Sequence, residues 1–156
     1  MPRVRLILAG GLLLAACSRK FDSQALGLVW TPPAGVRLIS ESAGPPPRAT
    51  FEGGIAWYAI PGLSTSLDES TLQATLQSVA DAARTPLHGK ISSAKVGSIL
   101  IGSVIRYELN GEDARTLAYV IPHLGDTVLL VLTSDASAYG RTSANLEMSL
   151  STLRWK

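Results

Sequence analysis

Residues 98–133 read SILIGSVIRYELNGEDARTLAYVIPHLGDTVLLVLT, and this stretch decides the fold. Between Ser98 and Leu109 the side chains alternate between two faces, which predicts a strand with one face in a core. Asn110-Gly111 follows at once and is the strongest short hairpin signal in the chain. The stretch therefore predicts antiparallel strands joined by tight turns.

The second half of this stretch completes the meander. Residues 116–121 are expected to return as a strand, and residues 122–126 to form the next turn. Residues 127–133 contain the run Val128-Leu129-Leu130-Val131-Leu132, which is apolar at every position. Such a run is typical of a central strand.

Upstream of this meander the sequence predicts two further strands. Pro32 and Pro33 exclude a helix interior at residues 29–33. We expect a short strand over residues 36–40 and, after the loop around Pro45-Pro46-Pro47, a second strand over residues 50–60. Gly53-Gly54 predicts a bulge or twist point within that second strand.

Two helices are expected, one before the meander in the sequence and one after it. Ser66 and Glu69 form a capping box that predicts a helix to about Arg84. Asp135 is suited to cap a second helix, from Ala136 to about Leu153. The predicted fold class is α+β: an antiparallel β-sheet meander with both helices packed on one face.

Length and composition restrict the class of protein. The chain has 156 residues, which suits one domain, and we place that domain at residues 26–156. A single Cys excludes an internal disulfide framework, and with two His it nearly excludes a zinc cage. Composition and charge do not suggest nucleic-acid binding.

The N-terminus carries the most specific motif. Arg3 and Arg5 precede an uncharged run, Leu6 to Ala16, of signal-peptide length. The run ends in Leu14-Ala15-Ala16-Cys17, which resembles the lipobox of bacterial lipoproteins. We therefore expect residues 1–16 to be a signal peptide and residues 17–25 a lipidated tether. A Cys within an uncleaved N-terminal helix is the alternative.

The lipobox resemblance implies a lipid anchor and a location in the cell envelope. It implies a diacylglyceryl thioether on Cys17, with a further acyl chain such as palmitate on the new N-terminus, and two or three chains anchor stably. The next residue is Ser18 and not Asp, which by the sorting rule of enteric bacteria predicts the outer membrane, facing the periplasm. Removing residues 1–16 discards Arg3 and Arg5, so the 12 basic residues that remain equal the 12 acidic ones.

The order of elements resembles the PsbP-like fold, including small bacterial lipoproteins of the DcrB type. The similarity includes the strand entry Trp30-Thr31-Pro32-Pro33-Ala34-Gly35-Val36, the capped helix at residues 66–84, Gly102, and residues 128–135 before a last helix. Val36 stands where that family usually has an aromatic residue. The resemblance implies an accessory or assembly factor that binds a protein partner, and it brings no catalytic residues.

A search for chemistry assigns no catalytic, cofactor-binding or metal-binding residue, and no cofactor. His88 and His123 are each predicted in a loop or turn, where an exposed His is the ordinary case. The chain has no nucleophile elbow and no glycine-rich phosphate loop. The acidic tip Glu112-Asp113 lacks the spacing of an EF-hand calcium loop. The only site residue assigned is Cys17, for lipidation.

Three functions remain open from the sequence. The first is a non-enzymatic envelope lipoprotein, held to the membrane by the lipid on Cys17, that binds a protein partner. The alternative is a small-molecule or lipid-binding periplasmic module with a cleft lined by Ile55, Trp57, Ile101 and Ile105. An enzyme using Ser with either His is the least favoured of the three.

Overall fold

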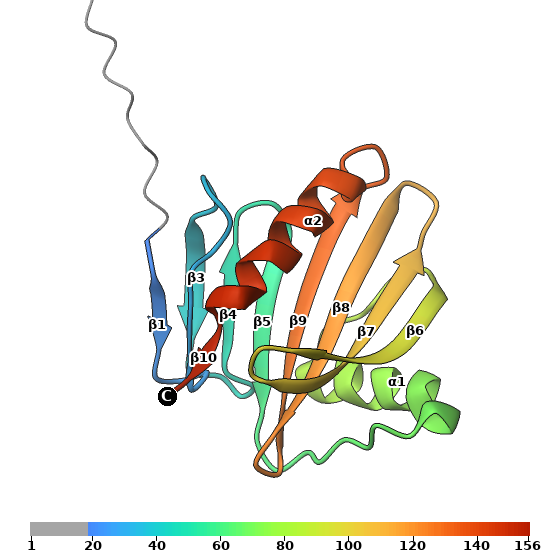
Figure 1. Cartoon of the computed structure of the whole chain (residues 1–156), viewed down its shortest axis with the longest axis horizontal. Coiled ribbons are helices and arrows are strands. Elements are labelled where there is room, and N and C mark those ends of the chain that lie inside the picture. Colours follow the sequence, from blue (N-terminus) through green and yellow to red (C-terminus); the bar gives the residue numbers. More distant parts are fainter. Residues whose placement is uncertain (1–18) are drawn as a thin grey trace, which may run out of the picture.

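The computed structural model describes residues 19–156 and has a seven-stranded antiparallel sheet at its centre (Figure 1). Cys17 and the predicted signal peptide lie outside the described residues. The strand order of this sheet is β3-β4-β5-β9-β8-β7-β6. The strands are β3 (Leu38–Ser42), β4 (Arg48–Phe51), β5 (Ile55–Ile60), β6 (Lys90–Ile99), β7 (Gly102–Asn110), β8 (Ala114–His123) and β9 (Asp126–Asp135).

A small second sheet brings the two ends of the described chain together. It has the order β1-β2-β10, with strands β1 (Phe21–Ser23), β2 (Leu28–Trp30) and β10 (Arg154–Trp155). The helices are α1 (Leu72–Ala83) and α2 (Tyr139–Ser149), with short 3₁₀ turns at Glu69–Thr71 (η1) and Leu150–Thr152 (η2). The predicted α+β class with an antiparallel meander is confirmed.

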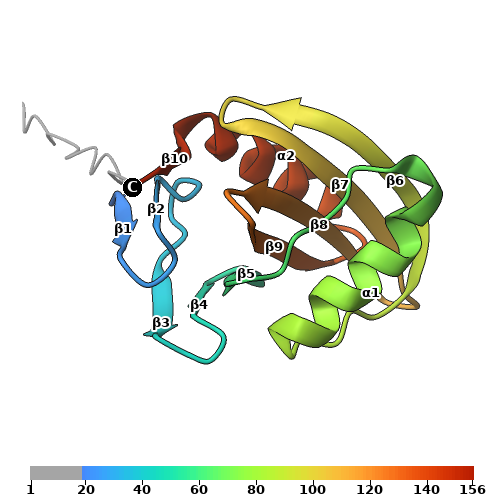
Figure 2. The ribbon, with the colours of Figure 1, turned by 90° about the horizontal axis from the view of Figure 1, so that it is seen from below.

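The two helices lie on opposite faces of the large sheet, so the prediction that both pack on one face is wrong (Figure 2). On β9, Val128, Leu130 and Leu132 belong to the core under α2. Leu129 and Val131 belong to the core under α1. Because successive side chains of a strand point to opposite faces, a strand apolar at every position needs a cover on both sides.

Two predicted strands are each divided by a turn. The strand expected over residues 50–60 is β4 and β5, because Gly53 and Gly54 both adopt positive φ angles and reverse the chain. The strand expected over residues 98–109 is the end of β6 and most of β7, with the turn at Leu100-Ile101. That turn contains no Gly, Pro, Asn or Asp before Gly102, and the alternation of side chains continues through it, so the sequence does not indicate a turn there.

The helix starts differ from the predicted caps. Asp68, not Ser66, caps η1, and its carboxylate accepts a hydrogen bond from the Ser70 backbone N–H. The last helix begins at Tyr139, and Asp135 instead accepts a backbone bond from Ala138. The residues after Ser149 tighten into η2 and then extend as β10, so the helix is shorter than expected. Neither helix in residues 19–156 is long and apolar enough to cross a membrane.

The folded part begins earlier than the predicted boundary at residue 26. Phe21 is buried and pairs with Trp30 in the small sheet, so β1 belongs to the domain and not to a tether. At the other end, the Lys156 backbone N–H donates to the Gly27 carbonyl, and the Lys156 ammonium pairs with Asp22. The short polar sequence around residue 22 gave no sign of a strand.

The core under α2 is built on four aromatic rings. Trp30 lies edge-on to Trp57, with ring centroids 5.3 Å apart, and edge-on to Phe51 at 5.2 Å. Phe21 extends the cluster by packing on Phe51 at 5.0 Å. The Trp30 indole N–H donates to Ser149 Oγ at 3.0 Å, whereas the buried Trp57 N–H has no partner among the described residues.

This difference gives a prediction about two matched substitutions. Trp30→Phe loses a buried hydrogen bond, which stabilises by about 1 kcal/mol on average. Trp57→Phe removes an N–H that is buried without a partner, which offsets part of the lost packing. We therefore expect urea unfolding to show a larger loss of stability for Trp30→Phe than for Trp57→Phe. Equal losses, or the reverse order, would contradict this account.

Candidate functional site

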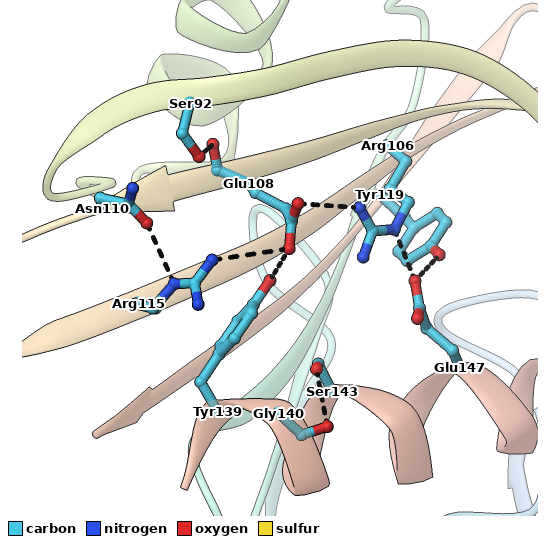
Figure 3. A network of polar contacts seen from close by, with 10 residues as sticks. All are labelled: Ser92, Arg106, Glu108, Asn110, Arg115, Tyr119, Tyr139, Gly140, Ser143 and Glu147. Carbon is cyan, nitrogen blue, oxygen red and sulfur yellow. Dashed lines mark hydrogen bonds and ion pairs between the residues drawn. The ribbon is translucent and has the colours of Figure 1, made fainter. Parts of the chain in front are cut away.

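The densest group of polar side chains lies between α2 and strands β7 and β8 (Figure 3). Glu147 on α2 accepts hydrogen bonds from Arg106 Nε at 2.5 Å and from the Tyr119 hydroxyl. Glu108 on β7 accepts from the Tyr139 hydroxyl at 2.7 Å and pairs with Arg106 Nη1 at 3.3 Å. These five residues, with Arg115, are called the α2 polar network below.

Arg115 closes one end of the α2 polar network. Its guanidinium carbon lies 4.2 Å from the centre of the Tyr139 ring, a cation–π contact. Its Nη2 is 3.9 Å from Glu108, and its Nε donates to the Asn110 side chain at 3.0 Å. Each carboxylate of the network thus faces an arginine and a tyrosine hydroxyl at once.

Strand alternation explains why these polar groups meet the helix. On β7, Ile105, Tyr107 and Leu109 face α1 and are buried. Arg106 and Glu108 therefore point to the α2 side. The α2 helix covers β8 and β9, and its polar residue Glu147 follows the buried Leu146. The network stands at the border between the covered and the open part of this face.

The electrostatics of the network fix its protonation state. The hydrogen bond from Tyr139, opposed by burial and aided by Arg106 and Arg115, lowers the pKa of Glu108. The pKa of Tyr119 is raised, mainly by burial and also by its hydrogen bond to Glu147. The pKa of Tyr139 is raised in the same way, mainly by burial and also by its hydrogen bond to Glu108. Burial alone would lower the pKa of Arg106, but its bonds to Glu147 and Glu108 outweigh this and raise it.

The α2 polar network is therefore suited to holding α2 on the sheet and not to acid–base catalysis. A general base needs a pKa near the working pH and a free lone pair toward a substrate. Glu108 is an ionised acceptor that already binds Tyr139 and Arg106, and both tyrosines keep their protons. Charge-assisted bonds of this kind stabilise more than neutral ones.

A pocket of about 450 Å³ opens on the other face, beyond the C-terminal end of α1. Its lining is mostly small or apolar at the sheet, with His88 and the acidic tip Glu112-Asp113 also lining it. The Tyr58 hydroxyl donates to Thr85 Oγ1 at 3.3 Å beside it. Its floor includes Ile55, Ala56, Thr116, Val131 and Thr133 from strands of the sheet.

The remaining candidate residues from the sequence do not converge. His88 is exposed in the loop after α1, whereas His123 ends β8 and stacks on Trp155 with ring centroids 4.0 Å apart. Asp126, three residues from His123, accepts a bond from the Gly62 backbone N–H at 2.7 Å. Within residues 19–156 no three side chains of His, Cys, Asp or Glu gather as metal ligands would.

The cleft suggested by Ile55, Trp57, Ile101 and Ile105 does not form. Trp57 and Ile105 are fully buried in the cores on opposite faces of the sheet. Ile101, in the β6–β7 turn, packs against the core under α2. Of the four residues, Ile55 alone lines the pocket near His88.

One pattern in the sequence indicates the α2 polar network, and none indicates the pocket. Arg106 and Glu108 occupy alternate positions of a strand whose other positions are apolar. Their partner Glu147 lies on a helix 41 residues beyond Arg106, and nothing local links the two. The pocket joins the β4–β5 turn, the loop after α1 and the β7–β8 turn, which no spacing in the sequence indicates.

Comparison with known proteins identifies the fold. No family model matches the chain, and no curated protein matches it. Among solved structures, cyanobacterial PsbP (CyanoP) from Synechocystis sp. PCC 6803 superposes with a TM-score of 0.62 at 15% identity, over 94% of this chain and 96% of that one. A Pseudomonas aeruginosa protein of unknown function, PA94, matches at a TM-score of 0.45 and 13% identity, over 88% of this chain and 96% of that one.

These findings define the fold of the protein. The chain is an α+β protein in which an antiparallel sheet is covered by one helix on each face. More narrowly, it has the PsbP-like fold, as the resemblance in its sequence implied.

The α2 polar network gives a prediction about stability. Glu147→Gln removes the carboxylate that Arg106 Nε and the Tyr119 hydroxyl share and leaves Arg106 paired with Glu108 alone, so we expect a loss of about 1–3 kcal/mol. Glu112→Gln is the matched control, because Glu112 is exposed at a hairpin tip and should stay within about 0.5 kcal/mol. Urea unfolding measures both. Equal effects would show that the network does not hold α2.

Glu108 gives a prediction about pH. Its pKa is lowered in the folded state, so its stabilising effect is complete above the unfolded pKa of about 4.3 and is lost as pH falls through the folded pKa. We expect the free energy of unfolding to fall as the pH drops into the acid range below the unfolded pKa, and to fall less steeply in Glu108→Gln. Identical slopes for the two proteins would contradict this.

Proposed function

We propose that this protein is a membrane-anchored envelope lipoprotein that acts as a non-enzymatic accessory or assembly protein and binds a protein partner. The observation that carries the proposal is the sequence Leu14-Ala15-Ala16-Cys17, followed almost at once by a folded domain that begins at Phe21. Four residues span at most about 14 Å. A lipid on Cys17 would hold the domain close to a bilayer surface.

The arrangement of polar groups supports a binding role over a catalytic one. The carboxylates of the α2 polar network are engaged with arginines and tyrosines that tie α2 to the sheet. The two histidines lie apart, His88 in the loop after α1 and His123 against Trp155. A PsbP-like domain positioned at a membrane is suited to present a surface to another envelope protein.

The alternative is a small-molecule-binding module, and the pocket near His88 favours it. Its volume of about 450 Å³ and its apolar floor fall in the range of ligand sites. Native mass spectrometry of the protein purified from its envelope would show a retained ligand, which Ala56→Trp should displace. A ligand-free spectrum would leave partner binding as the function.

The anchor is tested by a pair of substitutions in an enteric host. Cys17→Ala removes the acceptor sulfur, so we expect the protein to leave the membrane pellet for the soluble periplasmic fraction. Ser18→Asp keeps the anchor, and by the sorting rule it should move the protein from outer to inner membrane on a density gradient. Membrane retention of Cys17→Ala would refute the lipid anchor.

Partner binding is tested in whole cells. Chemical crosslinking of the unaltered protein should recover the same envelope protein in independent cultures. If crosslinkers of different length recover no envelope protein reproducibly, the proposed partner-binding function is wrong.

A further inference from the structure

Strand β6 forms one edge of the large sheet and leaves a long row of backbone groups open. It pairs with β7 along its inner side, and in residues 19–156 no other strand lies beyond it. No turn or loop backbone bond involves residues 90–99 either. An edge of ten residues with open N–H and C=O groups is a template for another strand.

A groove lies between α1 and the start of β6, where Lys90 and Ile91 line it. Its volume is about 960 Å³. Its floor is apolar and includes the buried Leu76, Ala80 and Leu109. Its helix wall is polar and includes Gln73, Gln77 and Asp81. An edge strand next to a groove that a helix borders is the geometry in which extended peptides add to a sheet.

The charges on β6 select the kind of strand that fits. The sequence of β6 is KISSAKVGSI, with two lysines and no carboxylate. Neither lysine takes part in an ion pair within the described part of the chain. Two copies of β6 would bring lysine near lysine, which disfavours pairing between copies. An acidic strand removes this repulsion and adds attraction.

The two faces of β6 fix the pattern of the partner. Ala94 and Val96 pack against the core on the α1 side. Lys95 pairs in register with Arg106 and so points to the opposite side. A strand added to this edge would meet apolar surface at every second residue and a lysine between them.

We propose that β6 and the α1 groove form a docking site for an extended acidic segment of a protein partner, which adds to the sheet as an eighth strand. The segment alternates apolar side chains, directed to the α1 side and into the groove beside Ile91, with a carboxylate beside Lys95. This inference rests on the proposed function, because it specifies where and how the partner binds.

The opposite edge of the sheet is less suited to this role. Strand β3 is half as long as β6. Both edge strands have a register shift, between Leu38 and Ser40 in β3 and between Ile91 and Ser93 in β6, so residues 93–99 form the longer regular edge. Strand β3 also carries a carboxylate, Glu41, which accepts a bond from Ser23 and would repel an acidic segment.

The test uses the folded chain and two synthetic nonapeptides. One alternates valine with glutamate and the other alternates valine with lysine. We expect the glutamate peptide to bind at least about tenfold more tightly by fluorescence anisotropy, and to bind less tightly as salt rises from about 50 to about 200 mM. In ¹⁵N NMR spectra, it should shift and protect amides of residues 91–98.

Three variants locate the site. Lys95→Glu reverses the charge beside the peptide, and we expect about tenfold weaker binding of the glutamate peptide and tighter binding of the lysine peptide. Ala74→Trp places a bulky ring in the groove from an exposed helix position and should weaken both. Arg141→Glu is the matched control, since it makes the same charge change at an exposed position of α2 and not on β6.

Several results would overturn the proposal. These are equal affinity for the two peptides, an equal effect of Lys95→Glu and Arg141→Glu, or amide shifts centred on β3. If the peptides fail while whole-cell crosslinking still recovers an envelope partner, the docking site is wrong and the proposed function stands. If crosslinking also fails, the proposed function is wrong as well.

Discussion

The apolar run Val128–Leu132 on β9 is the constraint on which the rest of the structure depends. A strand buried on both faces cannot leave either face to water, so each needs a separate cover. The α2 side is covered by α2 and the aromatic cluster, and the α1 side by α1. This constraint places the helices on opposite sides of one sheet and makes the small sheet at the chain ends part of the α2-side core.

What the helices leave uncovered is as informative as what they cover. On the α2 side, the helix does not reach the outer strands, and the border is occupied by Arg106, Glu108 and Glu147, which bind one another. On the α1 side, the helix leaves a groove toward β6 and a pocket beyond its C-terminal end. The α2 polar network therefore holds α2 on the sheet, and the open surfaces on the α1 side are available for binding.

The sequence predicted those parts of the fold that are decided locally. Asn110-Gly111 marks the β7–β8 hairpin, and the helix expected to end at about Arg84 is α1, which ends at Ala83. The turn at Leu100-Ile101 was missed because β6 and β7 continue one alternating pattern through it. The network was missed because its ion pairs join residues far apart in the chain. The placement of the helices was missed because a helix stripe shows that a face is buried, but not against which side of the sheet.

Photocrosslinking in intact cells is the most direct test of the proposal that this domain binds its partner along β6. A photoreactive amino acid would replace Lys95 on β6 in one strain and Ile39 on β3 in another. Both positions are exposed edge positions of the same sheet. The account predicts one discrete adduct with an envelope protein from position 95 and none from position 39. Adducts from position 39 alone, or equal adducts from both positions, would contradict it.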